Sequence, residues 1–262
     1  MKTSTGFTLI ELTLVIAILG IISVGFIGVI NIGSNVYSNV SSRDTLISSS
    51  RFAVERLNRE IRNALPNSIR IAALGDRQCV EFVPIVASTI YTQAPIFPDA
   101  AQTSISVIQF GNGYLGDDDD FVVIYPLNSN DAYDPSLQKR AGLKSIDTSV
   151  SNIWQLELDS AAQFSEESPT ERLFIISLPV SYCVAQNRLI RYQNYGFNIT
   201  QDLLSTANGV LMAEFLNVDE GLPFTYQEDV QMRNAVVQID FKFSQNNESV
   251  YFSNGVHINN VP

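Results

Sequence analysis

Hydrophobic residues dominate the first part of the chain. An apolar run extends to Ile30, and no charged side chain occurs from Leu12 to Ser42. About 20 consecutive apolar residues are enough for a helix to span a bilayer. The pattern therefore predicts a transmembrane helix over residues 7–30.

The pattern then becomes one-sided and stays so to about residue 65. Residues suited to a buried stripe recur at alternating spacings of three and four, namely Ile47, Ser50, Val54, Leu57, Ile61 and Ala64. This is the stripe of a helix that lies on a sheet. Pro66 should end the helix, because the residue before a proline is driven out of the α region. We expect one helix from about Thr8 to Leu65, with residues 31–65 as an amphipathic stem.

Charged side chains on the stem are spaced for pairing along the helix. Three i,i+4 pairs are expected, namely Arg51–Glu55, Glu55–Arg59 and Arg56–Glu60. Each such pair stabilises a helix by a few tenths of a kcal/mol.

After Pro66 the hydrophobic pattern changes to that of strands. Strand-like segments occur at Cys79–Pro84, Phe121–Tyr125, Leu173–Leu178 and Val237–Phe243, and Ser181–Val184 with Arg188–Tyr192 forms a predicted hairpin. Long polar segments that resemble surface loops fall at Tyr91–Ser104, Leu127–Ser151 and Ser160–Thr170. The fold class predicted is α+β, with a long N-terminal helix packed on a β-rich head over residues 66–262. About 200 residues suffice for one domain with its own core.

Composition and charge argue against some classes of protein. Hydrophobic residues make up 45% and charged residues 16%, which excludes a disordered chain. The net charge of −11 argues against binding to duplex nucleic acid, which needs clustered Lys and Arg. A basic stretch, Arg43–Arg70, precedes a strongly acidic head. This asymmetry indicates either an ordinary solvated stem and soluble head, or complementary packing of stems and heads in an assembly.

The two cysteines, Cys79 and Cys183, both lie in strand-like sequence. In an oxidising compartment such a pair predicts a disulfide. The alternative is two separate buried thiols.

No catalytic arrangement is evident. His257 is the only histidine, which excludes zinc motifs with two histidines, and no P-loop or nucleophile elbow occurs. We therefore predict that the protein is not an enzyme. The acidic run Asp117, Asp118, Asp119 and Asp120 offers oxygen ligands of the kind calcium prefers. It lacks the EF-hand spacing, and an acidic turn is the simpler interpretation, so no cofactor is expected beyond this weak calcium candidate.

The N-terminus combines three unusual features. A basic leader, residues 1–6, ends at Gly6, and Glu11 lies at the edge of the apolar run. A carboxylate at this position is costly and normally has a partner for its charge. Cleavage after Gly6 would give Phe7 a cationic amine, which could neutralise Glu11 of a neighbouring copy. The alternatives are an ordinary secretory signal, which is cleaved after its apolar region, or a plain membrane anchor.

Lys2, the segment Gly6–Leu12 and the long apolar helix behind them resemble the type IV pilin and pseudopilin family. The resemblance implies cleavage between Gly6 and Phe7 by an inner-membrane prepilin peptidase, and N-methylation of Phe7. It also implies a single-pass inner-membrane protein with its head in the periplasm, which later enters a filament. Its partners would be major and minor pilins, the inner-membrane assembly platform and membrane lipid.

Weaker cues suggest a position within the family. The head size and the segment Arg51–Arg62 are similar to those of J-type minor pseudopilins. The ending Gly255–Pro262 and the cysteine segments resemble a minor pilin of the mannose-sensitive haemagglutinin (MSHA) pilus. The leading expectation is a minor pilin that primes assembly at or near the tip and contributes to surface adhesion. The alternatives are a J-type subunit of a type II secretion system and, from another class, a membrane-anchored periplasmic enzyme.

Overall fold

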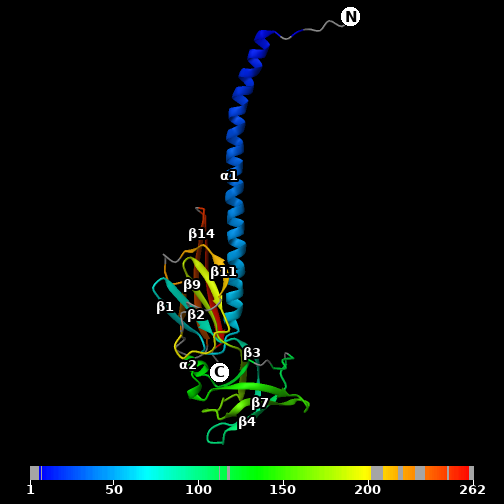
Figure 1. The fold of residues 1–262 in the computed structure, drawn as a ribbon, viewed down its shortest axis with the longest axis vertical. Helices are drawn as coiled ribbons and strands as arrows, with labels where there is room; N and C mark the ends of the chain where they lie inside the picture. Colours follow the sequence, from blue (N-terminus) through cyan, green and yellow to red (C-terminus); the bar gives the residue numbers. More distant parts are fainter. Residues whose placement is uncertain are drawn as a thin grey trace.

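The structure is a computed structural model. It describes residues 6, 8–111, 113–116, 119–201, 209–217, 221–227, 234–246 and 248–259. A single long helix, α1 (Leu9–Arg62), carries a β-rich head along its C-terminal half, and its N-terminal half projects away from the head (Figure 1). The predicted α+β class is confirmed.

Both ends of α1 have local causes. Thr8 caps the N-terminus in an extended conformation, with its hydroxyl accepting from the backbone N–H of Glu11 at 3.4 Å. The helix ends three residues before the predicted boundary at Leu65. The reason is that residues 63–65 bond to the chain leaving the first sheet instead: the N–H of Leu65 donates to the carbonyl of Val83 at 2.8 Å.

The predicted buried stripe is confirmed. Ser50, Val54, Leu57, Ile61 and Ala64 are buried, and Ile47 is half-buried. Val54, Leu57, Ile61 and Ala64 share a hydrophobic core with both sheets that lie beside α1.

The first sheet has five antiparallel strands in the order β1-β2-β9-β10-β11. Their bounds are β1 Arg70–Leu74, β2 Arg77–Phe82, β9 Val180–Ala185, β10 Arg188–Tyr192 and β11 Val210–Glu214. The predicted β9–β10 hairpin is confirmed, and its two turn residues, Gln186 and Asn187, both have positive φ, as a tight two-residue hairpin requires.

The second sheet is built on one long strand. Its members are β12 Leu216–Asn217, β13 Phe224–Gln227, β14 Asn234–Gln245 and β15 Glu248–Asn259. The strands β12, β13 and β15 all pair antiparallel with β14. Alternate residues of β14, including Val237, Ile239 and Phe241, are buried in the shared core, as the period-two pattern predicts.

Between β2 and β9 the chain forms a closed six-stranded barrel in the order β3-β4-β7-β6-β5-β8. The strands are β3 Ile85–Gln93, β4 Gln102–Ile108, β5 Phe121–Ile124, β6 Arg140–Asp147, β7 Ile153–Ala162 and β8 Arg172–Ile176, with α2 (Ser129–Tyr133) and η1 (Pro135–Leu137) between β5 and β6. Side chains such as Ile105, Val107 and Leu156 fill the interior. Figure 1 places the barrel beyond the C-terminal end of α1, at the end of the molecule farthest from the N-terminus.

The described part of the head contains two main hydrophobic cores, one around α1 and one inside the barrel. One expectation is corrected. The polar segment 127–151 is not a loop throughout, because it contains α2, η1 and β6. Only Leu143 of β6 is buried, so this strand has no alternating hydrophobic pattern that would reveal it.

Candidate assembly site

Of the predicted processing and assembly residues, Gly6 and Glu11 lie within the described part of the chain, and both are exposed. Gly6 is exposed, and a Cβ added to it would contact nothing within 4 Å. Glu11 lies in the first turn of α1, where a carboxylate interacts favourably with the helix dipole. The fold itself therefore does not require glycine at position 6. Phe7, the predicted new N-terminus, lies outside the described residues.

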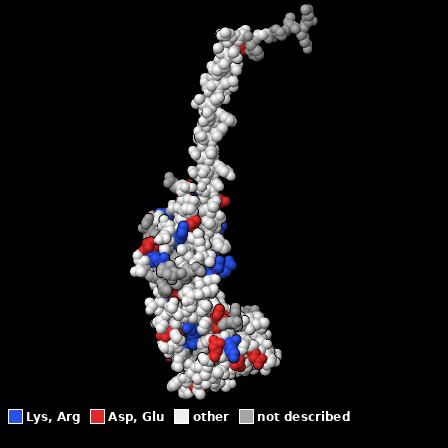
Figure 2. Space-filling view, viewed as in Figure 1, with Lys and Arg blue, Asp and Glu red and all other residues white. Residues whose placement is uncertain are grey.

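The first half of α1 is not covered by any residue that the structure describes. Every residue from Thr8 to Ser41 is exposed, including Leu9, Ile16 and Phe26. Figure 2 shows this half as an almost uncharged surface. Among the described helices, α1 alone is long and apolar enough to cross a membrane. Apolar surface of this extent needs lipid or other protein around it.

The disulfide lies where the barrel joins the first sheet. Cys79 on β2 and Cys183 on β9 are directly opposite in register and are bonded, as predicted. They are 104 residues apart in sequence, and the whole barrel falls within the loop that they close. The bond therefore joins the strand that leads into the barrel to the strand that leads out of it.

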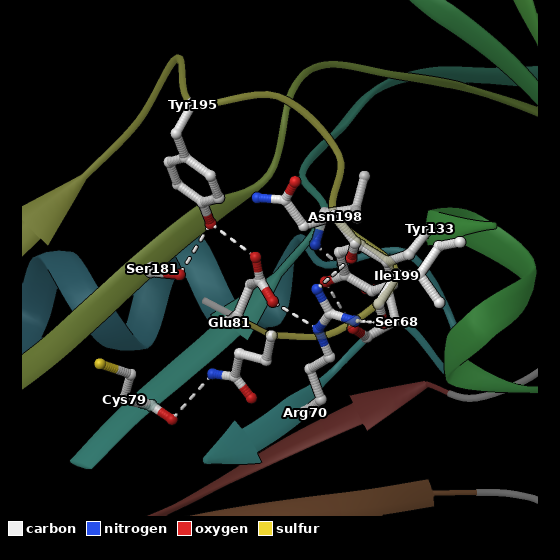
Figure 3. Close-up of polar contacts among 11 residues, drawn as sticks. Ser68, Arg70, Cys79, Glu81, Tyr133, Ser181, Tyr195, Asn198 and Ile199 are labelled. Carbon is white, nitrogen blue, oxygen red and sulfur yellow. Dashed lines mark hydrogen bonds and ion pairs between the residues drawn. The ribbon is translucent and has the colours of Figure 1, made fainter. Parts of the chain in front are cut away.

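A buried charge pair holds the same junction together (Figure 3). Glu81 on β2 is fully buried; one oxygen bonds to Arg70 Nε, and the other accepts from the Tyr195 hydroxyl at 2.8 Å. Ser181 Oγ lies 2.7 Å from that hydroxyl. Arg70 also donates to the carbonyls of Asn198 and Ile199, at 2.7 and 2.8 Å. One arginine thus ties β1, β2 and the segment after β10 together.

The network continues into the barrel through Tyr133 of α2. The Arg70 guanidinium lies 3.6 Å from the centre of the Tyr133 ring, and the Tyr133 hydroxyl donates to the carbonyl of Ser68 at 2.9 Å. Burial, and secondarily the charge of Glu81, raise the pKa of Tyr133 and of Tyr195 well above the ordinary value. Both tyrosines are therefore neutral hydrogen-bond donors throughout the physiological range.

A second arginine links the barrel to the segment after β10. Arg140 lies between Phe121 and Phe197, with its guanidinium carbon 3.6 Å from the Phe197 ring centre, and it donates to the carbonyl of Ala132 at 2.6 Å. Burial lowers its pKa to about 10. Direct bonds from the end of α1 add to this, since Asn63 exchanges hydrogen bonds with Ile85 at 2.6 and 2.9 Å. The barrel is thus held in a defined orientation relative to α1.

The acidic run is only partly described. Asp117 and Asp118 lie outside the described residues; Asp119 is exposed, and Asp120 is buried and accepts from the Tyr114 hydroxyl. Over the residues described, no three His, Cys, Asp or Glu side chains come together as a metal site. Asp119 and Asp120 line a groove of about 690 Å³ together with Arg59 and Arg191.

Pairing on the stem differs from the prediction. Of the three expected pairs, Arg56–Glu60 forms at 2.9 Å, and Glu60 also binds Arg191 of β10 at 2.9 Å. Arg51–Glu55 and Glu55–Arg59 are not ion pairs in the structure. The sequence also gave no sign of the Arg70–Glu81 pair, because its partners meet only through strand register.

Comparison with known proteins gives a family match at the N-terminus. Residues 1–27 match the family described as the prokaryotic N-terminal methylation motif. No curated protein and no solved structure was found to match the chain. The matched motif supports a type IV pilin-like protein and suggests a structural rather than enzymatic role. It implies processing by a prepilin peptidase and assembly with other pilins, and with the exposed apolar helix it fits an inner-membrane anchored pilin.

Proposed function

We propose that this chain is a minor pilin of a type IV pilus of the MSHA kind, which is cleaved after Gly6, methylated at Phe7 and incorporated into the filament. The observation that carries this proposal is the bare apolar half of α1, headed by the methylation motif and by Glu11 in its first turn. In this division residues 1–6 are the leader, 7–30 the membrane and filament-core segment, 31–65 the stem and 66–262 the periplasmic head.

The assembly role rests on neutralising Glu11. Burial of a lone carboxylate costs several kcal/mol, and a close cationic partner offsets much of that cost. The methylated amine of Phe7 on a neighbouring subunit would supply that partner inside the filament. The pair would also set the axial register between subunits, which apolar contact between helices leaves loosely defined.

A position at or near the tip is favoured by the place of the barrel. It extends past the C-terminal end of α1 instead of lying beside it (Figure 1). A subunit packed ahead of this one would have to contact the barrel, whereas the barrel of a leading subunit stays free. A free barrel at the tip would also be available for attachment to surfaces.

Glu11→Ala tests the proposal. The variant should still be cleaved after Gly6 and remain in the inner membrane, but it should reduce the number of pili per cell towards that of cells lacking the gene. Pilus counts by electron microscopy, with immunoblots for processing and amount, provide the measurement. Wild-type pilus numbers in the variant, together with loss of pili when the gene is deleted, would show that Glu11 has no assembly role in this subunit.

A J-type pseudopilin of a type II secretion system is the second candidate, favoured by the arginine-rich segment Arg51–Arg62. The two candidates differ in the phenotype of gene deletion. Loss of pili with normal protein secretion supports the minor pilin, and the reverse result supports the pseudopilin.

A further inference from the structure

The face of α1 that points away from the sheets carries a distinctive set of side chains. Its described residues Arg51, Phe52, Arg59 and Arg62 form what we call the stem patch. Phe52, Arg59 and Arg62 are separated by seven and three residues, and Arg51 by eight from Arg59, so all four share one face of the helix. The buried stripe occupies the opposite face.

The stem patch has no partner within the described chain. Arg51, Arg59 and Arg62 are exposed and make no ion pair with any residue that the structure describes. Phe52 is 61% exposed in their midst. An aromatic side chain surrounded by arginines is the composition typical of the centre of a protein interface.

The barrel carries a patch of opposite net charge. Between residues 85 and 176 there are thirteen acidic and four basic side chains, and acidic side chains predominate on the visible part of the barrel in Figure 2. Segment 97–99 lies beside segment 163–164, since the N–H of Phe97 donates to the carbonyl of Phe164 at 2.8 Å. The barrel patch comprises Phe97, which is 67% exposed, with the exposed carboxylates of Asp99, Glu166 and Glu167, of which Glu166 also binds Lys139 at 2.6 Å.

We propose that the stem patch is the docking site for the barrel patch of a second copy of this chain. Glu55 is exposed on the same face of α1, four residues from both Arg51 and Arg59, so the stem patch has a net charge of +2. Each patch has one exposed phenylalanine, and the net charges of the two patches are opposite. The contact would bring the two rings together and place guanidinium groups against carboxylates, where the planar arginine fork binds two oxygens. Charge complementarity of this kind steers association and fixes orientation.

The geometry determines which copy leads. The two patches lie at different heights along the molecule, because the barrel is beyond the end of α1 (Figure 1). Two copies anchored at equal depth in a membrane cannot bring them together. A copy that has moved forward presents its stem patch to the barrel of the copy behind it, and its own barrel stays free. This setting rests on the proposed function, but the contact itself does not.

Self-association of the purified full-length protein in detergent tests the contact. Sedimentation equilibrium should detect a dimer whose dissociation constant rises by about tenfold or more between about 50 and 500 mM NaCl, since screening weakens exposed ion pairs. The double variants Arg51→Glu with Arg59→Glu, and Asp99→Lys with Glu167→Lys, should each weaken association by about tenfold or more. An equimolar mixture of these two variants should form a heterodimer of near wild-type affinity.

The control is Lys144→Glu with Arg188→Glu, which changes the net charge as much as the stem variant does but lies outside both patches. It should leave association unchanged. A monomeric wild type would overturn the proposal, as would variants that each weaken association but fail to pair with one another. Association that is unaffected by salt and by every charge variant would place the contact on the apolar half of α1 and would also overturn it. None of these outcomes bears on the Glu11 pilus count.

Discussion

At the scale of single residues, Glu81 stands out because its carboxylate is fully buried in the head. A fully buried carboxylate is tolerated only with its charge paired and its oxygens hydrogen-bonded. Arg70 supplies the charge, and Tyr195 supplies the second bond at 2.8 Å. Removing either partner leaves an uncompensated buried acceptor, so the junction depends on all three side chains together.

Tyr195→Phe should expose this dependence through pH. At neutral pH the variant should lose about 1–3 kcal/mol of unfolding free energy, because one Glu81 oxygen is left unsatisfied. The folded-state pKa of Tyr195 lies above its ordinary value, so the unfolded chain ionises first as pH rises past about 10. The stability that this tyrosine contributes is therefore present below about pH 10 and is lost above it, with a slope of about 1.4 kcal/mol per pH unit.

Denaturant unfolding of the protein in detergent, between about pH 8 and pH 12, measures that slope. This slope should be shallower in Tyr195→Phe by about 1.4 kcal/mol per pH unit, the contribution of one tyrosine. Tyr251→Phe, at an exposed tyrosine, is the matched control and should leave the slope unchanged. An identical alkaline slope in wild type and Tyr195→Phe would mean that Tyr195 ionises as readily in the folded protein as in the unfolded chain.

Gly6→Val separates folding from processing. A Cβ at position 6 meets nothing in the structure, so the variant should fold with unchanged stability. It should nevertheless retain its leader, because the small residue is expected to be needed by the peptidase and not by the fold. Intact mass of the membrane-extracted protein distinguishes a chain that begins at Met1 from one that begins at Phe7 with a methylated amine. Normal cleavage of the valine variant would contradict this expectation.

At the scale of elements, the sequence predicts those whose patterns are local. The apolar run and the stripe predict α1, and the two short apolar segments around Ala185–Asn187 predict the β9–β10 hairpin. The barrel was missed because its closure depends on pairing of β3 with β8, residues 85–90 against 172–176, which no local pattern reveals. The strand β6 was missed because its residues are mostly exposed or half-buried.

The candidate site was predictable to the same extent. The cysteine pair was predicted from composition and is confirmed, whereas the roles of Gly6 and Glu11, predicted from motif and charge, remain predictions. The Arg70–Glu81 pair was not predicted, because it depends on the register between β1 and β2. The stem patch was not predicted either, because the sequence does not show which face of α1 points away from the sheets.

Loss of the disulfide should loosen the link between β2 and β9. A closed loop of this length contributes roughly 4–5 kcal/mol in the chain-entropy description, and measured values are more often about 2–4 kcal/mol. Cys79→Ser with Cys183→Ser should therefore unfold at lower denaturant concentration by an amount in that range. The control is wild type unfolded in the presence of reductant, which should approach the variant. Non-reducing peptide mapping of periplasm-exposed protein verifies the bond, and two free thiols there would contradict it.

At the scale of the whole molecule, the two cores meet at a small junction. A third cluster that includes Leu65, Val83, Tyr133 and Phe174 lies between them. The chain leaves the first sheet at Phe82 and returns at Val180, and these two residues are directly opposite in register. The barrel is therefore an insertion into a hairpin-like connection and not a partner in the strand order of the first sheet.

This topology predicts that the α1-based head folds without the barrel. Replacing Ile85–Ile176 by a linker of about four residues leaves a connection of about nine residues between Phe82 and Val180. This is enough to close β2 and β9 as a hairpin, because a hairpin connection can be as short as two to five residues. The variant loses the barrel's contacts with Leu65 and Val83, so a second version carries Leu65→Ser and Val83→Thr to limit the newly exposed apolar surface. Both should form the Cys79–Cys183 bond, retain helix and strand signals in circular dichroism, and unfold in one cooperative transition. The readouts are non-reducing peptide mapping and thermal melting in detergent. If both versions lack the bond and melt without cooperativity, the two cores depend on each other, and the barrel is required for the head to fold.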